Sequence, residues 1–270
     1  MPPQTAEGLA DALRPLLEAP KRAAVLCDVD GTLAPIAPRA DAARVPPEVS
    51  RAIAALAPRY GLVGCISGRS ALDARRLVGV GGIAYAGMHG AEILQPSESR
   101  PAVSPALAEY RDRVRGFAAT AWSRVRPLGI RHEDKGPIWA LHWRGVANDA
   151  AAQTALEEVA REAEAEGLAV HWGRKVLEIR PPVRISKADA VTSLLEGRLA
   201  VRAALFGGDD ATDLDAFDAL DSLVARSRLD AAVKVGVASA EGPEDIVRRA
   251  DVVVEGPAGF HDVLAALAAA

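Results

Sequence analysis

Residues 23–33 read AAVLCDVDGTL, an apolar run that ends in a turn rich in carboxylates. Five consecutive apolar residues are typical of a short parallel strand that is buried on both faces of a sheet. Asp28 and Asp30 follow this strand with one residue between them, so we expect both side chains to reach one crevice. Such a pair can divide the roles of nucleophile and acid/base, or share a hard divalent cation. An ordinary Asp-Gly turn with solvated acids is the remaining interpretation.

The same pattern, an apolar run followed by a polar turn, returns twice along the chain. Residues 61–66 precede Ser67-Gly-Arg69, and residues 203–206 precede Gly-Gly-Asp209-Asp210. Helical patterns alternate with these runs, which predicts an α/β fold with a Rossmann-like parallel-sheet core. Ligands of open α/β sheets bind outside the carboxyl ends of the strands, so the three turns are expected to lie together. The acids after 206 also fit a plain helix N-terminus.

The middle of the chain has a different pattern. Strands are predicted over 130–135, 138–144, 168–172 and 175–179, with helices over 106–124 and 148–166. This order favours an antiparallel sheet with helices on one face, an α+β cap inserted into the first domain. We therefore predict a catalytic core formed by 1–103 and 184–270, and an inserted cap domain over 104–183 that recognises the substrate.

Composition narrows the class of protein. The chain has 270 residues, of which 50% are hydrophobic and 25% charged, and its net charge is −4 with no long basic run. These values argue against nucleic acid as the main partner. The longest uncharged stretch, 77–91, is Gly-rich and shorter than the ~20 residues that span a bilayer. The first residues lack a signal-peptide layout, so we expect a cytoplasmic protein with no membrane partner.

Four motifs occur in a fixed order. They are Asp28-x-Asp30-Gly-Thr-Leu, Ser67, Lys187 in the first turn of a predicted helix over 186–195, and Gly208-Asp-Asp210. Together they resemble the signature of haloacid-dehalogenase-like phosphatases. Segments within the inserted domain and around it also resemble trehalose-6-phosphate phosphatases, namely 85–92, 133–135, 141–144, 175–181 and 208–217. The chain departs from that pattern at Met88, Ala188 and Asp215.

The resemblance implies a role for each motif. Asp28 would be the nucleophile that takes the phosphoryl group, and Asp30 would protonate the leaving oxygen and then activate water. Mg²⁺ would be held by Asp28, the carbonyl of Asp30 and Asp209, with Asp210 in support. The charge of the phosphate oxygens would be neutralised by Lys187, Ser67 and Thr32. Phosphoryl transfer needs this combination of positioning and charge stabilisation.

The inserted domain would recognise the sugar. Strand alternation places Arg131, Glu133 and Lys135 on one face, while Glu178 projects from another strand beside Arg180. Charged groups suit a polyhydroxylated ligand, although a solvated outer sheet face explains the same pattern. His142 and His89 are also open to a structural interpretation. The substrate-binding residues that the resemblance favours are Arg69, His89, Gly90, Glu133, Lys135, Arg144 and Glu178.

The expected activity is Mg²⁺-dependent hydrolysis of trehalose 6-phosphate to trehalose and phosphate through an aspartyl-phosphate intermediate. A phosphatase for another sugar phosphate, such as sucrose or glucosylglycerol phosphate, is the nearest alternative. A catalytically silent partner that regulates a synthase belongs to a different class. Intact Asp28, Asp30, Lys187 and Asp209 argue against such a partner, because a binding module has no need of all four. A trehalose-phosphate synthase remains a partner that the resemblance suggests.

Overall fold

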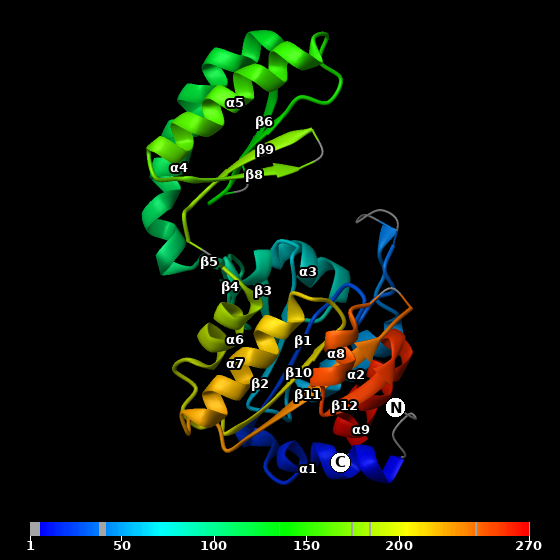
Figure 1. Ribbon diagram of the computed structural model, residues 1–270. Helices are drawn as coiled ribbons and strands as arrows, with labels where there is room; N and C mark the ends of the chain where they lie inside the picture. The colour runs from blue at the N-terminus through cyan, green and yellow to red at the C-terminus, as the bar shows by residue number, and fades with distance from the viewer. Residues whose placement is uncertain are drawn as a thin grey trace. The chain divides into compact units, whose positions relative to one another are not determined.

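The chain folds into two units in the computed structural model, which describes residues 6–37, 42–134, 136–173, 175–183, 185–240 and 242–269. The core unit comprises Met1–Ala102 and Ile185–Ala270, and the inserted unit comprises Val103–Arg184 (Figure 1). The chain therefore leaves the core once and returns to it once. Lys135 lies outside the described residues.

The core unit is built on one sheet, whose strand order in the described residues is β12-β11-β10-β1-β2-β3-β4-β5. From β12 to β3 all neighbouring strands are parallel, and β4 pairs with β3 in the antiparallel direction. The strands are β1 (Ala23–Cys27), β2 (Leu62–Ile66), β3 (Ala84–Gly87), β4 (Glu92–Leu94), β5 (Ala102–Val103), β10 (Ala203–Gly208), β11 (Ala231–Ala238) and β12 (Val252–Glu255).

Helices cover both faces of this sheet. Alternate residues of β1 explain why, since Val25 packs into one apolar cluster and Leu26 into the other. The first cluster is completed by α1 (Ala6–Leu17), α2 (Pro47–Leu56), α3 (Ala71–Val78) and α9 (Gly256–Ala269). The second is completed by α6 (Lys187–Leu195), α7 (Asp213–Ala225) and α8 (Glu244–Arg249). The predicted α/β class with a parallel-sheet core is confirmed.

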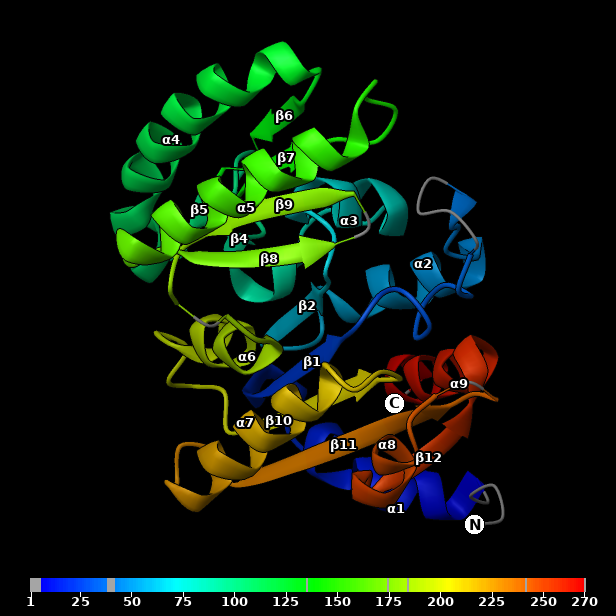
Figure 2. The ribbon, with the colours of Figure 1, turned by 45° about the horizontal axis from the view of Figure 1, so that its top comes forward.

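The inserted unit contains an antiparallel sheet with the order β6-β7-β9-β8. Its elements are α4 (Pro105–Val125), β6 (Arg131–Asp134), β7 (Trp139–His142), α5 (Asp149–Ala165), β8 (Ala169–Gly173) and β9 (Val176–Arg180). Both helices pack on one face of the sheet (Figure 2). Leu141 and Leu177 are fully buried on that face. All four tryptophans of the chain belong to this unit. The face that alternates with the buried one carries Arg131, Glu133, His142, Glu178 and Arg180.

Several elements differ from those predicted. The sequence analysis did not identify α1, β3, β4 or β5. Short 3-10 turns add Pro20–Arg22, Met88–Gly90 and Arg126–Leu128. The strand predicted over 138–144 ends at His142, so Arg144 lies in the turn that follows. Gly145 has a φ of 80° in that turn, a conformation that a glycine adopts without strain. Within the described residues, no helix is both long enough and apolar enough to cross a bilayer.

Candidate active site

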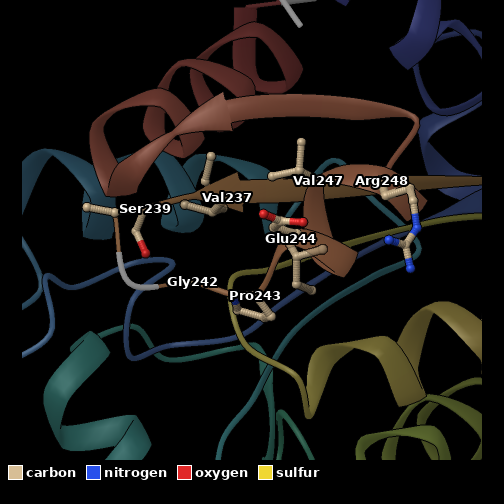
Figure 3. Close-up of a pocket in the computed structure, with 10 residues that line it drawn as sticks. Val237, Ser239, Gly242, Pro243, Glu244, Val247 and Arg248 are labelled. Carbon is tan, nitrogen blue, oxygen red and sulfur yellow. The ribbon is translucent and has the colours of Figure 1, made fainter.

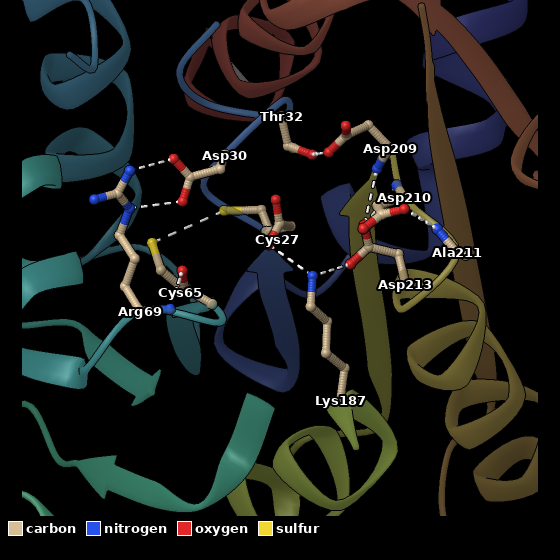
Figure 4. A network of polar contacts seen from close by, with 12 residues as sticks. Cys27, Asp30, Thr32, Cys65, Arg69, Lys187, Asp209, Asp210, Ala211 and Asp213 are labelled. Carbon is tan, nitrogen blue, oxygen red and sulfur yellow. Dashed lines mark hydrogen bonds and ion pairs between the residues drawn. The ribbon is translucent and has the colours of Figure 1, made fainter. Parts of the chain in front are cut away.

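The carboxyl ends of β10, β1 and β2, which are neighbours in the sheet, carry Asp209, Asp28 and Ser67. Figure 4 labels Asp209 together with Asp30, Thr32, Arg69, Lys187 and Asp213 around it. Asp28 continues the ladder beyond β1, because its backbone N–H donates to the carbonyl of Gly207 at 2.8 Å. All three side chains belong to buried residues that are at most 4% exposed. The parallel register therefore brings together groups that are up to 181 residues apart.

Lys187 connects two acids at the centre of the site. Its Nζ donates to Asp28 Oδ1 at 2.7 Å and to Asp213 Oδ1 at 2.6 Å. The other oxygen of Asp213 accepts the backbone N–H groups of Asp209 at 3.0 Å and Asp210 at 2.9 Å. The turn after β10 is thereby held against the lysine. Lys187 itself begins α6, where Ser186 and Asp189 form a capping box, and Ala188 occupies an ordinary helical position.

The turn after β1 approaches Asp209 so closely that only glycine fits. Gly31 has a φ of 96°, and a Cβ at this position would lie 2.0 Å from Asp209 Oδ2. The next residue, Thr32, donates its hydroxyl to Asp209 Oδ1 at 3.0 Å. The Asp-x-Asp-Gly-Thr motif therefore fixes the Asp209 carboxylate as well as supplying its own acids.

The buried acids form a group that can hold a cation. One carboxylate oxygen from each of Asp28, Asp209 and Asp213 lies within 4.8 Å of the other two. An all-oxygen donor set with several carboxylates fits Mg²⁺. Asp210 is not part of this group: it is exposed, and its Oδ1 accepts the N–H of Ala211 at 2.6 Å. Sequence reasoning missed Asp213, although its position four residues after Asp209 was a signal.

Burial shifts the protonation of these groups. Desolvation raises the pKa of Asp28 to about 8, aided by the charge of Asp213 and opposed by Lys187. Desolvation likewise raises the pKa of Asp209 to about 6, with Asp213 adding to the effect. For Lys187, desolvation is outweighed by the charges of Asp28 and Asp213, which hold the pKa of the amine above its usual value. The site thus concentrates more negative charge than Lys187 alone offsets, as a cation site requires.

Asp30 is held by an arginine rather than by the lysine. Arg69 donates from Nε to Asp30 Oδ2 and from a terminal nitrogen to Asp30 Oδ1, both at 2.7 Å. This hydrogen bond raises the pKa of the Arg69 guanidinium. Arg69 comes from the turn after β2, where Ser67 Oγ accepts the Arg69 N–H at 3.1 Å. The structure thus gives Arg69, a predicted substrate ligand, a contact with the predicted acid/base.

His89 and Gly90 lie in a left-handed segment after β3. Met88, His89 and Gly90 have φ values of 51°, 60° and 114°, of which the first two are strained for residues with a side chain. A Cβ at Gly90 would lie 3.0 Å from Ala190, so the segment packs tightly on the helix that carries Lys187. His89 Nδ1 is buried with no hydrogen-bond partner among the described residues, and desolvation lowers the pKa of this imidazole.

Two further features lie near the same edge of the sheet. A cavity of about 510 Å³ at the end of β11 is lined by Ser239, Gly242, Pro243, Glu244 and Arg248, among others (Figure 3). The sequence analysis singled out none of these residues.

Cys27 and Cys65 are buried on adjacent strands with their Sγ atoms 4.0 Å apart, and their mutual contact raises the pKa of Cys27. Both cysteines are free thiols.

The remaining predicted substrate ligands belong to the inserted unit. Glu133 is exposed on β6 and contacts His142 across the β6–β7 pair, with 3.1 Å between Glu133 Oε2 and His142 Nε2. Glu178 on β9 is half-buried and accepts from Arg180. Arg144 is exposed in the turn after β7, away from the strand positions that the sequence predicted.

A family profile and several curated relatives place the chain in one family. The sequence profile of the trehalose-phosphatase family matches residues 26–246. The trehalose-phosphate phosphatase of Mycobacterium marinum is 34% identical over 214 residues, which cover 74% of this chain and 52% of that protein. An uncharacterized glycosyl hydrolase of Mycobacterium tuberculosis, Rv2006, is 36% identical over 207 residues, 74% of this chain but 15% of that protein. The chain thus spans about half the length, or less, of these curated relatives.

Solved structures share the fold across the whole chain. The trehalose-6-phosphate phosphatase of Aspergillus fumigatus superposes with a TM-score of 0.64 at 23% identity and covers 100% of both chains. The C-terminal domain of a trehalose synthase regulatory protein from Candida albicans superposes with a TM-score of 0.59 at 13% identity, covering 98% of both chains. At these identities the likeness establishes the architecture alone.

Proposed function

Because the chain belongs to the trehalose-phosphatase family, we propose that it hydrolyses trehalose 6-phosphate to trehalose and inorganic phosphate. The observation that carries this proposal is the buried ion network in which Lys187 contacts both Asp28 and Asp213. A buried lysine between acids at the carboxyl edge of a parallel sheet offers a fixed positive charge to a phosphate. A purely structural network would not need the accompanying carboxylate at Asp209.

We propose that Mg²⁺ is the cofactor, held by Asp28, Asp209 and Asp213. When bound, the cation supplies positive charge that neutralises the acids and the phosphate oxygens. The Asp30 carbonyl remains a proposed ligand from the family resemblance. Asp210 is better suited to shaping the turn, because its carboxylate accepts from the neighbouring Ala211 N–H.

We propose a two-step displacement in which the chain's own residues supply the nucleophile and the acid/base. Asp28 attacks phosphorus while the bond to the sugar oxygen breaks, and Asp30 donates a proton to that oxygen. Asp30 then takes a proton from water, which attacks the aspartyl phosphate and releases inorganic phosphate and free Asp28. Lys187, Ser67 and Thr32 are proposed to neutralise the phosphate oxygens in both steps. In the structure Arg69 pairs with both oxygens of the Asp30 carboxylate, and this pairing has to open for Asp30 to carry the proton that it donates.

We propose that the inserted unit recognises the sugar through Glu133, Lys135, Arg144 and Glu178. Support comes from the charged sheet face that carries Glu133 and Glu178, because carboxylates accept hydrogen bonds from sugar hydroxyls. Arg69, His89 and Gly90 belong to the core unit. Of these, His89 offers a buried nitrogen that a ligand hydroxyl can satisfy. A cytoplasmic location stays a prediction from the composition and the first residues, and a synthase partner stays a prediction from the resemblance.

Phosphate release from a panel of sugar phosphates tests the proposal. The panel contains trehalose 6-phosphate, sucrose and glucosylglycerol phosphates, and a small aryl phosphate, each with Mg²⁺ and with EDTA. We expect the highest kcat/KM for trehalose 6-phosphate and no turnover in EDTA. Preference for another sugar phosphate would replace the substrate but keep the chemistry. Absence of turnover with every compound would favour the regulatory role instead.

A further inference from the structure

Two acids of the inserted sheet lie in one cross-strand row. The strand register pairs Glu133 with Ala140, Ala140 with Glu178, and Glu178 with His171. Glu133 and Glu178 therefore stand two strand spacings apart on the same face, about 10 Å between their backbones, with a small residue between them. This separation suits two hydroxyl groups on opposite sides of one sugar ring.

The first acid has a partner on the neighbouring strand. His142 lies diagonally across from Glu133, two residues from the directly opposed position, and its Nε2 is 3.1 Å from Glu133 Oε2. The side chains are 32% and 54% exposed, so the contact sits at the surface. An exposed pair adds little to the stability of a fold, which leaves orientation of the carboxylate as its main effect.

The second acid has a partner on its own strand. Arg180 lies two residues after Glu178, on the same face, and donates to Glu178 Oε2 from Nε at 3.0 Å and from a terminal nitrogen. The Glu178 side chain is only 13% exposed. A carboxylate so far removed from water needs a hydrogen-bonding partner of opposite charge. Two nitrogens of Arg180 donate to this one oxygen, which satisfies that requirement and holds Oε2 of Glu178 in place.

We infer that His142 and Arg180 are positioning residues for sugar recognition, each of which holds one acid in its binding orientation. This inference rests on the proposed function, and it assigns to the two residues an effect that passes through Glu133 and Glu178. A carboxylate that is already held in place loses less side-chain freedom when a hydroxyl binds to it. The binding energy of the sugar is then available to lower KM instead of ordering the protein.

The test compares kcat/KM for trehalose 6-phosphate with kcat/KM for a small aryl phosphate in single and double variants. Arg180→Ala and His142→Ala should each lower the ratio of the two values, by about 3- to 10-fold, the size expected for one hydrogen bond. The loss at Arg180 should be the larger, because Glu178 is the more buried acid. Arg131→Ala is the matched control, since Arg131 is exposed and directly opposite His142 on the same face.

Double variants separate positioning from direct contact. If Arg180 acts through Glu178, Arg180→Ala should add no loss in the Glu178→Ala background, and His142→Ala should add none in the Glu133→Ala background. His142→Gln, which keeps a terminal N–H, should restore most of the ratio. Arg180→Lys replaces Arg180→Ala in the cycle if the alanine variant does not fold, as judged by circular dichroism.

The outcomes distinguish this inference from the proposed function. Additive losses in the double variants would overturn the inference and make His142 or Arg180 a direct ligand. Unchanged ratios in both single variants, with reduced ratios in Glu133→Ala and Glu178→Ala, would overturn the inference alone. Unchanged ratios in the glutamate variants as well would overturn sugar recognition by this face and the inference with it.

Discussion

The charged groups of the two units differ in how far water reaches them. In the core unit the Lys187 and Asp28 side chains are 3% and 6% exposed, whereas the His142 and Glu133 side chains of the inserted unit are 32% and 54% exposed. Buried charges are costly to desolvate but act strongly on a ligand once they are in place. Exposed charges lose little hydration free energy on folding and act only modestly on a bound ligand. The difference suits phosphoryl transfer in the first region and graded discrimination between sugars in the second.

Removal of the nucleophile should give the largest effect and tests the core region alone. Asp28→Asn should lower turnover of every phosphate ester at least about 10⁴-fold, because an amide does not form the aspartyl phosphate. Phosphate release measures the loss, and circular dichroism verifies the fold. Near-normal turnover in a folded variant would contradict the assignment of Asp28 and leave the core region without its proposed chemistry.

Removal of the acid/base separates two steps within the core region. Asp30→Asn should lower kcat/KM for a sugar phosphate about 10²- to 10⁴-fold, the usual contribution of proton transfer. An aryl phosphate with an acidic leaving group needs no proton on that oxygen, so its kcat/KM should fall less. Equal losses for both substrates would show that Asp30 does not protonate the leaving group.

The contrast between the two regions predicts different substrate dependence. Glu133→Ala and Glu178→Ala should each lower kcat/KM for trehalose 6-phosphate about 10- to 150-fold. This is the loss expected when a hydrogen bond to a charged group, which contributes roughly 1.5–3 kcal/mol, is removed. Both should spare an aryl phosphate, which has no sugar hydroxyls. Lys187→Ala is the control from the core and should damage both substrates. Equal losses in the glutamate variants would mean that recognition and chemistry are not divided between the regions.

The smallest expected effect is on the free energy of unfolding. Replacement of Asp209 should raise this stability although it should lower activity. Burial raises the pKa of Asp209 from 3.8 to about 6, so its contribution to folding is favourable below about pH 4 and is lost as the pH rises through 6. At pH 7.5 in EDTA, Asp209→Asn should therefore unfold with a free energy about 1–3 kcal/mol higher than the unsubstituted protein. Urea denaturation at pH 7.5 and pH 4 measures the difference.

Addition of Mg²⁺ provides the control for this stability experiment. A cation that binds only the folded state should raise the stability of the unsubstituted protein and should add little to the stability of Asp209→Asn. A variant that is less stable than the parent at pH 7.5 in EDTA would show that the Asp209 charge is satisfied without a cation.

The parts of the fold that the sequence predicts are those whose signal is local. The apolar run 23–27 is a strand with the same bounds, because five buried apolar residues in sequence require a sheet covered on both faces. The strand Ala84–Gly87 was not predicted, since its short Ala- and Gly-rich sequence has no strand pattern of its own. It is a strand because β2 pairs with it, and that pairing depends on tertiary structure.

The candidate site shows the same limit. Asp28, Asp30 and Asp209 are conspicuous in sequence because each follows an apolar strand. Asp213 is not, because an acid in the first turn of a helix is common and its contact with Lys187 joins residues 26 positions apart. The Arg69 fork on Asp30 joins residues 39 positions apart and is likewise invisible to local patterns.

The distribution of tryptophan makes the inserted unit optically distinct. Trp122, Trp139, Trp143 and Trp172 all lie between Val103 and Arg184, so tryptophan emission, excited at a wavelength that tyrosine does not absorb, originates in that unit alone. Trp139 stacks on His132 with 5.0 Å between the ring centroids, a neighbour that quenches emission more strongly when it is protonated. Emission therefore follows the inserted unit through a melt, while far-ultraviolet dichroism follows both units. Melting curves from the two signals that separate along the temperature axis would identify two cooperative units within one chain.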